Sequence, residues 1–273
     1  MTIRKADFKM LEIFSYPFMI KALVAGVLIT LSCAILGVPL VLKRYSMIGD
    51  GLSHVGFGAL AIASVFELPP LIITIPVVIV AAFLLIGITD NKKNKGDSAI
   101  ALISTGSLAL GVIVISVFSD GNSELSNYLF GSILAISDVE LWLSVILSVF
   151  VLAIFIFYFN RIFAVTFDET FSRAVGMKTS SYNAVFAVLT ALTVVLGMKM
   201  MGSLLISALI IFPALISMRI FKTFFNVTVS SVIFSLISFF IGFFISYIFE
   251  LPTGATIVAL NLFIYILISI IRK

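Results

Sequence analysis

The chain has few of the residues on which soluble enzymes depend. Only 11% of its 273 residues are charged, and it contains one histidine, one tryptophan and one cysteine. A soluble domain would carry about 25% charged residues. No His/Cys cluster, no nucleophile elbow and no G-x-x-x-x-G-K-[ST] loop occurs, and Cys33 can form no internal disulfide. These absences exclude an ordinary soluble globule and a disulfide scaffold, and they predict a protein that is not an enzyme.

Apolar residues make up 62% of the chain, including 27 phenylalanines. They form runs that are continuously apolar, which excludes the alternating pattern of an outer-membrane barrel. About 20 such residues span a bilayer as a helix. We therefore predict an all-α polytopic membrane protein with about nine transmembrane helices in a single domain, 1–273. The runs are 17–42, 52–66, 69–89, 99–118, 139–160, 181–198, 203–218, 225–248 and 255–271, and the second is short for a full crossing.

The chain carries 17 basic and 13 acidic residues. With nine spans, most of the basic residues fall on one side, which the positive-inside rule makes cytoplasmic together with the C-terminus. The charges then orient helices, and no nucleic-acid partner is expected. This basic side holds Lys43, Arg44, Lys92, Lys93, Lys95, Arg161, Arg173, Lys178, Arg219, Lys222, Arg272 and Lys273.

Two segments do not fit a simple series of spans. Residues 1–16 mix charged residues with Phe8, Leu11, Ile13 and Phe14, which indicates a tail lying in the membrane interface. Residues 119–138 begin polar and then turn apolar over a piece too short to cross, so we expect a short or re-entrant helix there.

The tetrapeptide Phe-Glu-Leu-Pro occurs at 66–69 and again at 249–252, each time between two runs on the same side. One explanation is that proline favours the first turn of a helix. The other is a diverged internal repeat of the kind that transporters use.

The only histidine, His54, lies four residues after Asp50 in a glycine-rich segment. If the helix already begins near Gly49, the two side chains share one face. A carboxylate oxygen and an imidazole nitrogen suit a first-row divalent cation, and ionisable residues at the start of a span are functional candidates. The alternative is structural: Asp50 caps the helix and His54 hydrogen-bonds a neighbouring carbonyl.

The longest polar stretch on the basic side is 161–180. Thr166 and Glu169 have capping-box spacing, Phe167, Phe171 and Val175 follow at intervals of four, and Gly176 is placed to end a helix. The pattern predicts an amphipathic helix over 166–178 with Arg173 and Lys178 near its end. Such a helix either lies passively on the membrane or docks into a groove on a partner.

Five motifs in order along the chain resemble those of metal-ion ABC transporter permeases, the zinc/manganese/iron importer family. The first is Leu42-Lys-Arg44-Tyr-Ser46-Met-Ile-Gly-Asp50-Gly-Leu-Ser-His54, and the others lie at 129–134, 167–177, 202–214 and 251–254. The resemblance implies the type II ABC importer permease architecture in a bacterial cytoplasmic membrane. It also implies a homodimer of permeases, two copies of a cytoplasmic ATP-binding subunit that holds the ATP, and an extracellular or periplasmic metal-binding protein.

The resemblance assigns roles to particular residues as well. Asp50 and His54 match the positions that coordinate the transported Mn, Zn or Fe ion. The segment 167–178 matches the coupling helix, with Phe167, Asp168, Phe171, Arg173 and Gly176 as the matching residues. Two alternatives stay open: a type II importer for an iron chelate or cobalamin, and an ion-coupled secondary transporter that uses Asp50 and needs no ATPase.

Overall fold

The computed structural model describes residues 17–90, 96–118, 131 and 136–272, and every regular element in these ranges is helical. Nine of the described helices are long and apolar enough to cross a membrane, which confirms the predicted all-α chain with nine spans. The helices are α2 (Pro17–Leu42), α3 (Ser46–Val65), α4 (Pro70–Asp90), α5 (Gly96–Phe118), α7 (Asp138–Phe157), α8 (Phe159–Phe167), α9 (Glu169–Ala174), α10 (Thr179–Met201), α11 (Ser203–Ile220), α12 (Phe224–Phe249) and α13 (Thr253–Ile271).

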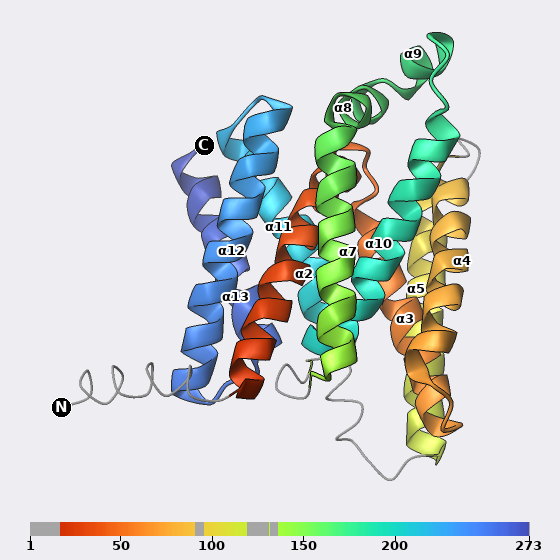
Figure 1. Cartoon of the computed structure of the whole chain (residues 1–273), viewed down its shortest axis with the longest axis vertical. Helices are drawn as coiled ribbons and strands as arrows, with labels where there is room; N and C mark the ends of the chain where they lie inside the picture. Colours follow the sequence, from red (N-terminus) through yellow and green to blue (C-terminus); the bar gives the residue numbers. More distant parts are fainter. Residues whose placement is uncertain (1–16, 91–95, 119–130, 132–135, 273) are drawn as a thin grey trace, which may run out of the picture.

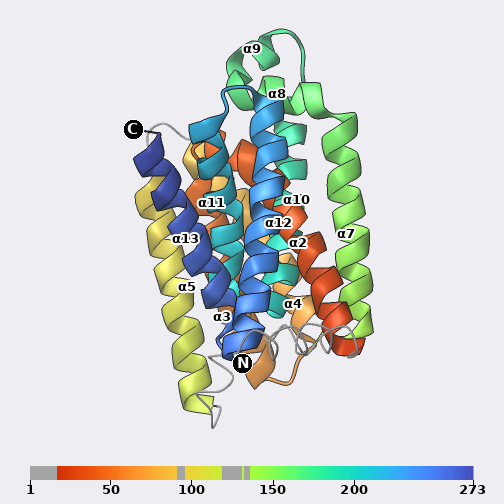
Figure 2. The same cartoon turned by 90° about the vertical axis from the view of Figure 1, so that its left-hand side faces the viewer.

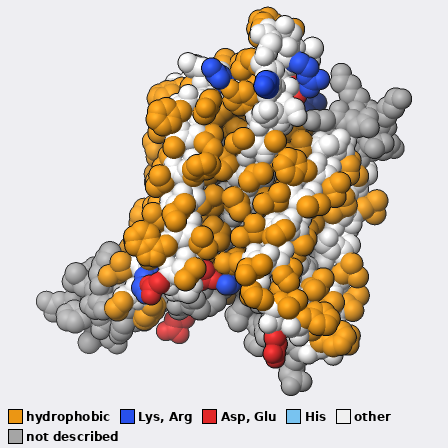
Figure 3. Space-filling model, turned by 45° about the vertical axis from the view of Figure 1, so that its right-hand side comes forward, with side chains coloured by type: hydrophobic (Ala, Val, Ile, Leu, Met, Phe, Trp, Pro, Cys, Tyr) orange, Lys and Arg blue, Asp and Glu red, His pale blue; other side chains and the backbone are white. Residues whose placement is uncertain are grey.

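The spanning helices form one bundle, in which they lie side by side and alternate in direction, while α8 and α9 extend beyond one end (Figures 1 and 2). We call this end the α8–α9 end. Helices α2, α3, α10 and α11 are mostly buried, whereas less than a quarter of α4, α5 and α13 is buried. Charged side chains gather at the two ends of the bundle, and hydrophobic side chains cover the flank between them (Figure 3). The molecule therefore has the surface of a protein embedded in lipid.

The second span corrects one sequence prediction. Helix α3 has 20 residues and starts at Ser46 rather than at the apolar residue 52. At 1.5 Å per residue it is about 30 Å long, enough to cross the hydrocarbon core. Hydropathy underestimated it because its first turns contain Gly49, Asp50 and His54, which are helical despite being polar or small.

The alternation of the spans brings the described members of the predicted basic side together. Helices α2, α11 and α13 all end at the α8–α9 end, as does the hairpin between α7 and α10 (Figure 1). The assignment of the α8–α9 end to the cytoplasm stays a prediction from the positive-inside rule. The expected tail at 1–16 and most of the expected re-entrant segment at 119–138 lie outside the described residues.

The repeated tetrapeptide makes the same turn twice. Glu67 and Glu250 both take the left-handed conformation, with φ of 52° and 54°. In each turn the following leucine closes the helix, as Leu68 N–H donates to Ala63 O at 2.8 Å and Leu251 N–H to Ser246 O at 3.0 Å. The two segments therefore share a left-handed helix end followed by proline at the next helix start.

Close helix contacts depend on small residues. A Cβ at Gly37 in α2 would overlap the backbone carbonyl oxygen of Ile210 in α11, and one at Gly58 in α3 would lie 2.8 Å from the carbonyl oxygen of Ser107 in α5. Buried serines add hydrogen bonds between helices, for example Ser148 Oγ to Leu28 O at 2.9 Å. In lipid, where apolar burial gives no net drive for helices to associate, such close packing and polar contacts hold the bundle together.

We predict that Gly37→Ala lowers stability by about 1–3 kcal/mol, because the added methyl group must push α2 away from the α11 backbone. The matched control is Gly87→Ala in α4, where no atom lies within 4 Å of the added Cβ. Thermal unfolding of both variants in detergent tests this. Equal melting temperatures for the two variants would contradict the close α2–α11 contact.

Candidate functional site

Asp50 and His54 lie on one face of α3, as predicted. Asp50 Oδ2 and His54 Nε2 are 3.6 Å apart, and the two side chains are 38% and 25% exposed. At 1.5 Å per residue, His54 lies about 12 Å along the helix from its start and thus within the span. The pair therefore lies within a candidate membrane span and is partly exposed.

The purely structural explanation of this pair loses its support. Helix α3 begins after Tyr45, and no side chain caps it, so Asp50 is not a helix cap. His54 Nδ1 is buried and has no hydrogen-bond partner within the described part of the chain. Eight other buried side-chain atoms of the described residues also lack a partner, so the case for a ligand depends on Nε2, which faces Asp50.

Four neighbouring helices enclose the rest of α3. A Cβ at Gly49 would lie 3.1 Å from the Ile210 side chain of α11, and one at Gly56 would lie 2.7 Å from the Met198 side chain of α10. Ser53 Oγ lies 3.0 Å from Ser207 Oγ of α11 and donates to Asp50 O at 2.8 Å. Helices α4 and α5 cover the remaining sides. The glycines thus let the neighbouring helices pack close to α3, while the Asp50–His54 face stays partly open.

The pair supplies one oxygen and one nitrogen ligand, a set that accommodates Mn²⁺, Zn²⁺ and Fe²⁺. Within the described ranges no group of three His, Cys, Asp or Glu residues lies close enough to hold a metal ion. Two ligands leave a coordination sphere incomplete, so water or a second copy of the chain would have to complete it. An incomplete site suits transient binding better than permanent binding.

The segment predicted as one helix over 166–178 is instead α8 followed by α9. The predicted capping box is wrong, because Thr166 belongs to α8 and its Oγ1 donates to Ile162 O at 2.6 Å. Asp168 caps α9 in its place, with its carboxylate accepting from Phe171 N–H at 2.8 Å. Aspartate is as good a cap as serine or threonine, and the extra turn of α8 shifts the cap by two residues.

Gly176 ends this segment as predicted. Its φ is +87°, and it donates from its N–H to Arg173 O at 3.1 Å while Met177 N–H donates to Ser172 O at 3.0 Å. These two hydrogen bonds form a complete Schellman motif. Only glycine adopts this backbone conformation without steric cost, so α9 has a fixed stop as well as a fixed start.

The three apolar residues predicted to share a face are all exposed at the α8–α9 end. Phe171 of α9 is 63% exposed, Val175 directly after α9 is 58% exposed, and Phe167 at the end of α8 is 58% exposed. The ring of Phe167 also contacts Phe163 and Phe224, with centroids 4.8 and 6.2 Å away. We call Phe167, Phe171 and Val175 the apolar tip. Exposed apolar groups of this kind indicate a surface that contacts either another protein or the membrane.

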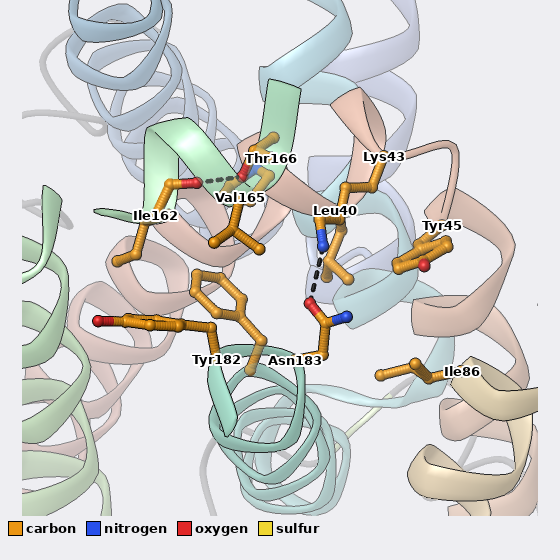
Figure 4. A pocket seen from close by; sticks show the side chains of 11 residues that line it. Leu40, Lys43, Tyr45, Ile86, Ile162, Val165, Thr166, Tyr182 and Asn183 are labelled. Atoms are coloured by element: carbon orange, nitrogen blue, oxygen red, sulfur yellow. Dashed lines mark hydrogen bonds between the residues drawn. The ribbon is translucent and has the colours of Figure 1, made fainter. Parts of the chain in front are cut away.

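An ion-pair network that sequence reasoning missed joins α9 to the turn before α3. Lys43 Nζ donates to Glu169 Oε2 at 3.1 Å and to Asn183 Oδ1 at 2.7 Å, and Asn183 Nδ2 donates to Glu169 Oε1 at 3.2 Å. Arg173 Nη2 donates to the same Glu169 oxygen at 3.1 Å. The Lys43 side chain points to Asn183 at the edge of a small cavity of about 20 Å³ (Figure 4).

The network keeps Glu169 ionised. Partial burial alone would raise the pKa of Glu169, but the hydrogen bond from Asn183 and the charges of Lys43 and Arg173 outweigh it and hold this pKa below its ordinary value. Lys43 and Glu169 are 126 residues apart, and no local pattern reveals the contact. The one local signal is the i,i+4 spacing of Glu169 and Arg173, which indicates an ion pair on α9 but not the contact with Lys43.

We predict that Glu169→Gln lowers the free energy of unfolding by about 1 kcal/mol at neutral pH, because the paired charge is lost. A lowered pKa means that the wild-type network is intact above the ordinary value of 4.5 and is lost as the pH falls through the lowered folded-state pKa. The melting temperature of Glu169→Gln should therefore fall less than that of the wild type upon acidification. Glu67→Gln, which changes an exposed glutamate, is the control, and a wild-type acid response in Glu169→Gln would contradict the network.

Comparisons with known proteins agree with this geometry. A family model described as "ABC 3 transport family" matches residues 15–272. The chain is 28% identical over 251 residues to the manganese import system permease protein ScaB of Streptococcus gordonii, with 92% of this chain and 90% of ScaB covered. It is 27% identical over 252 residues to the high-affinity zinc uptake system membrane protein ZnuB of Haemophilus influenzae, with 92% and 97% covered.

The fold has a solved counterpart. A chain of PsaBC from Streptococcus pneumoniae, solved in complex with a Fab, superimposes with a TM-score of 0.83 at 27% identity, and the match covers 95% of both chains. The predicted ABC importer permease fold is confirmed, and the prediction of a transport subunit rather than an enzyme is confirmed as well. With a family model matched over almost its whole length, this chain belongs to the ABC 3 transport family.

Proposed function

We propose that this chain is the membrane permease subunit of an ATP-driven importer of divalent transition-metal ions, Mn²⁺, Zn²⁺ or Fe²⁺. The observation that carries the proposal is the Asp50–His54 pair on the partly open face of α3, inside the span, with His54 Nε2 3.6 Å from Asp50 Oδ2. The relatives that are named for manganese and zinc uptake support the same class of cargo.

The pair forms a transient binding site for a partly dehydrated cation within the membrane. Asp50 supplies a carboxylate oxygen and His54 a neutral imidazole nitrogen, while water or the same residues of a second permease copy complete the coordination sphere. Two ligands per copy bind the ion strongly enough to extract it from its delivery protein and weakly enough to release it. Because the mixed ligand set accommodates all three metals, the proposal is made for the class.

Transport follows an alternating-access cycle driven from outside the chain. Two permease copies, two copies of a cytoplasmic ATP-binding subunit and an extracellular or periplasmic metal-binding protein form the working assembly. The apolar tip docks on the ATP-binding subunit at the α8–α9 end, which is the cytoplasmic end in this proposal. Asp168 and Gly176 fix the start and the stop of α9 so that it moves as a unit.

The Lys43–Glu169 ion pair connects that motion to the cargo site. Glu169 belongs to the first turn of α9, and Lys43 lies in the turn between α2 and α3. Asp50 follows seven residues after Lys43 in the chain. A displacement of α9 therefore reaches the helix that carries the metal ligands through one directly hydrogen-bonded contact.

The two alternatives have less support. Membership of an ABC transport family argues against an ion-coupled secondary transporter, which would need no ATPase. An importer of an iron chelate or cobalamin would have no use for a carboxylate and an imidazole converging on its path.

We expect His54→Ala to reduce uptake of the transported metal at least tenfold, because only one of the two protein ligands remains. The test is radiometal or elemental uptake by proteoliposomes that contain the whole transporter, with Ile62→Ala on the exposed far part of α3 as the control. The basal ATPase rate should not change. Wild-type uptake by His54→Ala would contradict the role of the pair.

We expect Phe171→Asp to abolish co-purification of the ATP-binding subunit, since a charge would be buried in the docking contact at a cost of several kcal/mol. Phe171→Leu keeps an apolar side chain and should retain the complex. An intact complex with Phe171→Asp would show that the apolar tip is not the docking surface.

A further inference from the structure

A second feature of the α8–α9 end has no part in cargo binding. A crevice of about 890 Å³ opens between the ends of α7 and α10, beneath α8 and the turn that follows α9. We call it the α7–α10 crevice. Its apolar wall comes from Phe150 and Ile154 of α7 and from Val185 and Phe186 of α10. In Figure 1 these two helices stand next to each other on the near side of the bundle and separate toward α8.

The rim of the crevice is basic. Arg161 of α8 and Lys178, just before α10, both line it, and no Asp or Glu does. Arg161 Nη1 donates to Tyr182 Oη at 3.1 Å, and its guanidinium lies 5.7 Å from the Tyr158 ring centroid. Neither Arg161 nor Lys178 forms an ion pair with a carboxylate of the described residues. Two uncompensated positive charges thus stand directly above an apolar wall.

Along the crevice, from the middle of the span toward the α8–α9 end, the lining residues change from apolar to aromatic to basic, as expected from the hydrocarbon core to the interface of a membrane. Phe150 and Ile154 belong to the last two turns of a span, and Phe157 at the end of that span is 83% exposed. Tyr158 and Tyr182 come next, at the level where interfacial tyrosines concentrate, and Arg161 and Lys178 stand near them. An occupant that fits has an apolar part in the hydrocarbon and a negative group at the interface.

We propose that the α7–α10 crevice binds an anionic phospholipid of the cytoplasmic leaflet. The phosphate group lies between Arg161 and Lys178, and an acyl chain lies along Phe150, Ile154 and Val185. Basic pockets between spans on the cytoplasmic side recognise anionic lipid headgroups in this way. A free phosphate ion would leave the apolar wall in contact with water.

Such a lipid would also stabilise the position of α9. The turn Val175–Lys178, which includes the Gly176 stop, lines the crevice together with α7 and α10. A bound lipid therefore contacts the two spans and the end of α9 at once, and should stiffen the position of the apolar tip. The proposal does not depend on which metal is carried, and it would stand if the cargo proposal failed.

Native mass spectrometry of the full-length chain in detergent tests the proposal. The probes are phosphatidylglycerol, phosphatidylcholine with the same acyl chains, and inorganic phosphate. We expect one phosphatidylglycerol per chain to bind in preference to phosphatidylcholine and to raise the melting temperature, with no effect of phosphate. In Arg161→Gln/Lys178→Gln its dissociation constant should rise about thirtyfold, since each basic residue near the surface contributes about fivefold.

The matched control is Arg219→Gln/Lys222→Gln, which removes two charges from the same end but outside the crevice. Arg219 makes a similar contact, donating to Tyr265 Oη at 3.1 Å, and lipid binding should not change. If the first double variant does not fold, Ser181→Glu supplies a second test, because it places a negative charge on an exposed crevice position in the first turn of α10 and should repel the lipid.

Three results would overturn the proposal. The first is equal binding of phosphatidylglycerol to the wild type and to Arg161→Gln/Lys178→Gln or Ser181→Glu. The second is equal stabilisation by inorganic phosphate, which would identify a free-anion site. The third is unchanged lipid binding with loss of the ATP-binding subunit from the double variant, which would assign the surface to that protein.

Discussion

The cost of an unpaired polar group in hydrocarbon governs most of this structure. Each such group costs several kcal/mol, so the backbone is helical wherever it crosses and the side chains find partners nearby. Glu140 in the first turn of α7 is buried and pairs with Lys199 of α10, and Asp138 pairs with Lys21 of α2. Buried serines and threonines donate to backbone carbonyls within or between helices. Asp50 and His54 differ from these pairs because both belong to one helix, four residues apart, and their side chains stay partly exposed within the span.

The same constraint explains how the site is built. A helix that carries an aspartate and a histidine inside the membrane must be held firmly elsewhere, and α3 achieves this through glycines that bring four helices close to its backbone. The ligands occupy the side that remains. The α8–α9 end extends beyond the spans, so unpaired polar groups cost less there. Polar networks and exposed apolar groups therefore occur side by side at this end. The Lys43–Glu169–Asn183 network ties these two regions together through side chains on α9, α10 and the turn before α3.

Sequence reasoning predicted the parts of the structure that hydrophobicity and local spacing determine. The nine spans, the shared face of Asp50 and His54 and the Gly176 stop all follow from patterns within a few residues. The start of α3 was misplaced because glycine, aspartate and histidine interrupt the apolar run although they are helical. The cap of α9 was assigned to Thr166 because two possible caps stand two residues apart, and only the length of α8 decides between them.

The rest could not be predicted because it depends on how distant segments meet. The bonds of Asn183 to Lys43 and Glu169 exist only once α2, α9 and α10 are assembled. The aromatic cluster around Phe224, which holds α8 against the start of α12, joins residues more than fifty positions apart. The α7–α10 crevice likewise arises from the angle between two spans. Each of these features joins residues that lie far apart in the chain.

The central claim is that this chain carries a divalent transition metal into the cell. The most direct test is a whole-cell elemental profile in metal-poor medium, which compares the native host with a strain lacking this chain and with the same strain after its restoration. We expect a selective fall in cellular manganese, zinc or iron that restoration reverses. An unchanged metal profile in the strain lacking the chain, with no other importer of that metal induced, would contradict it.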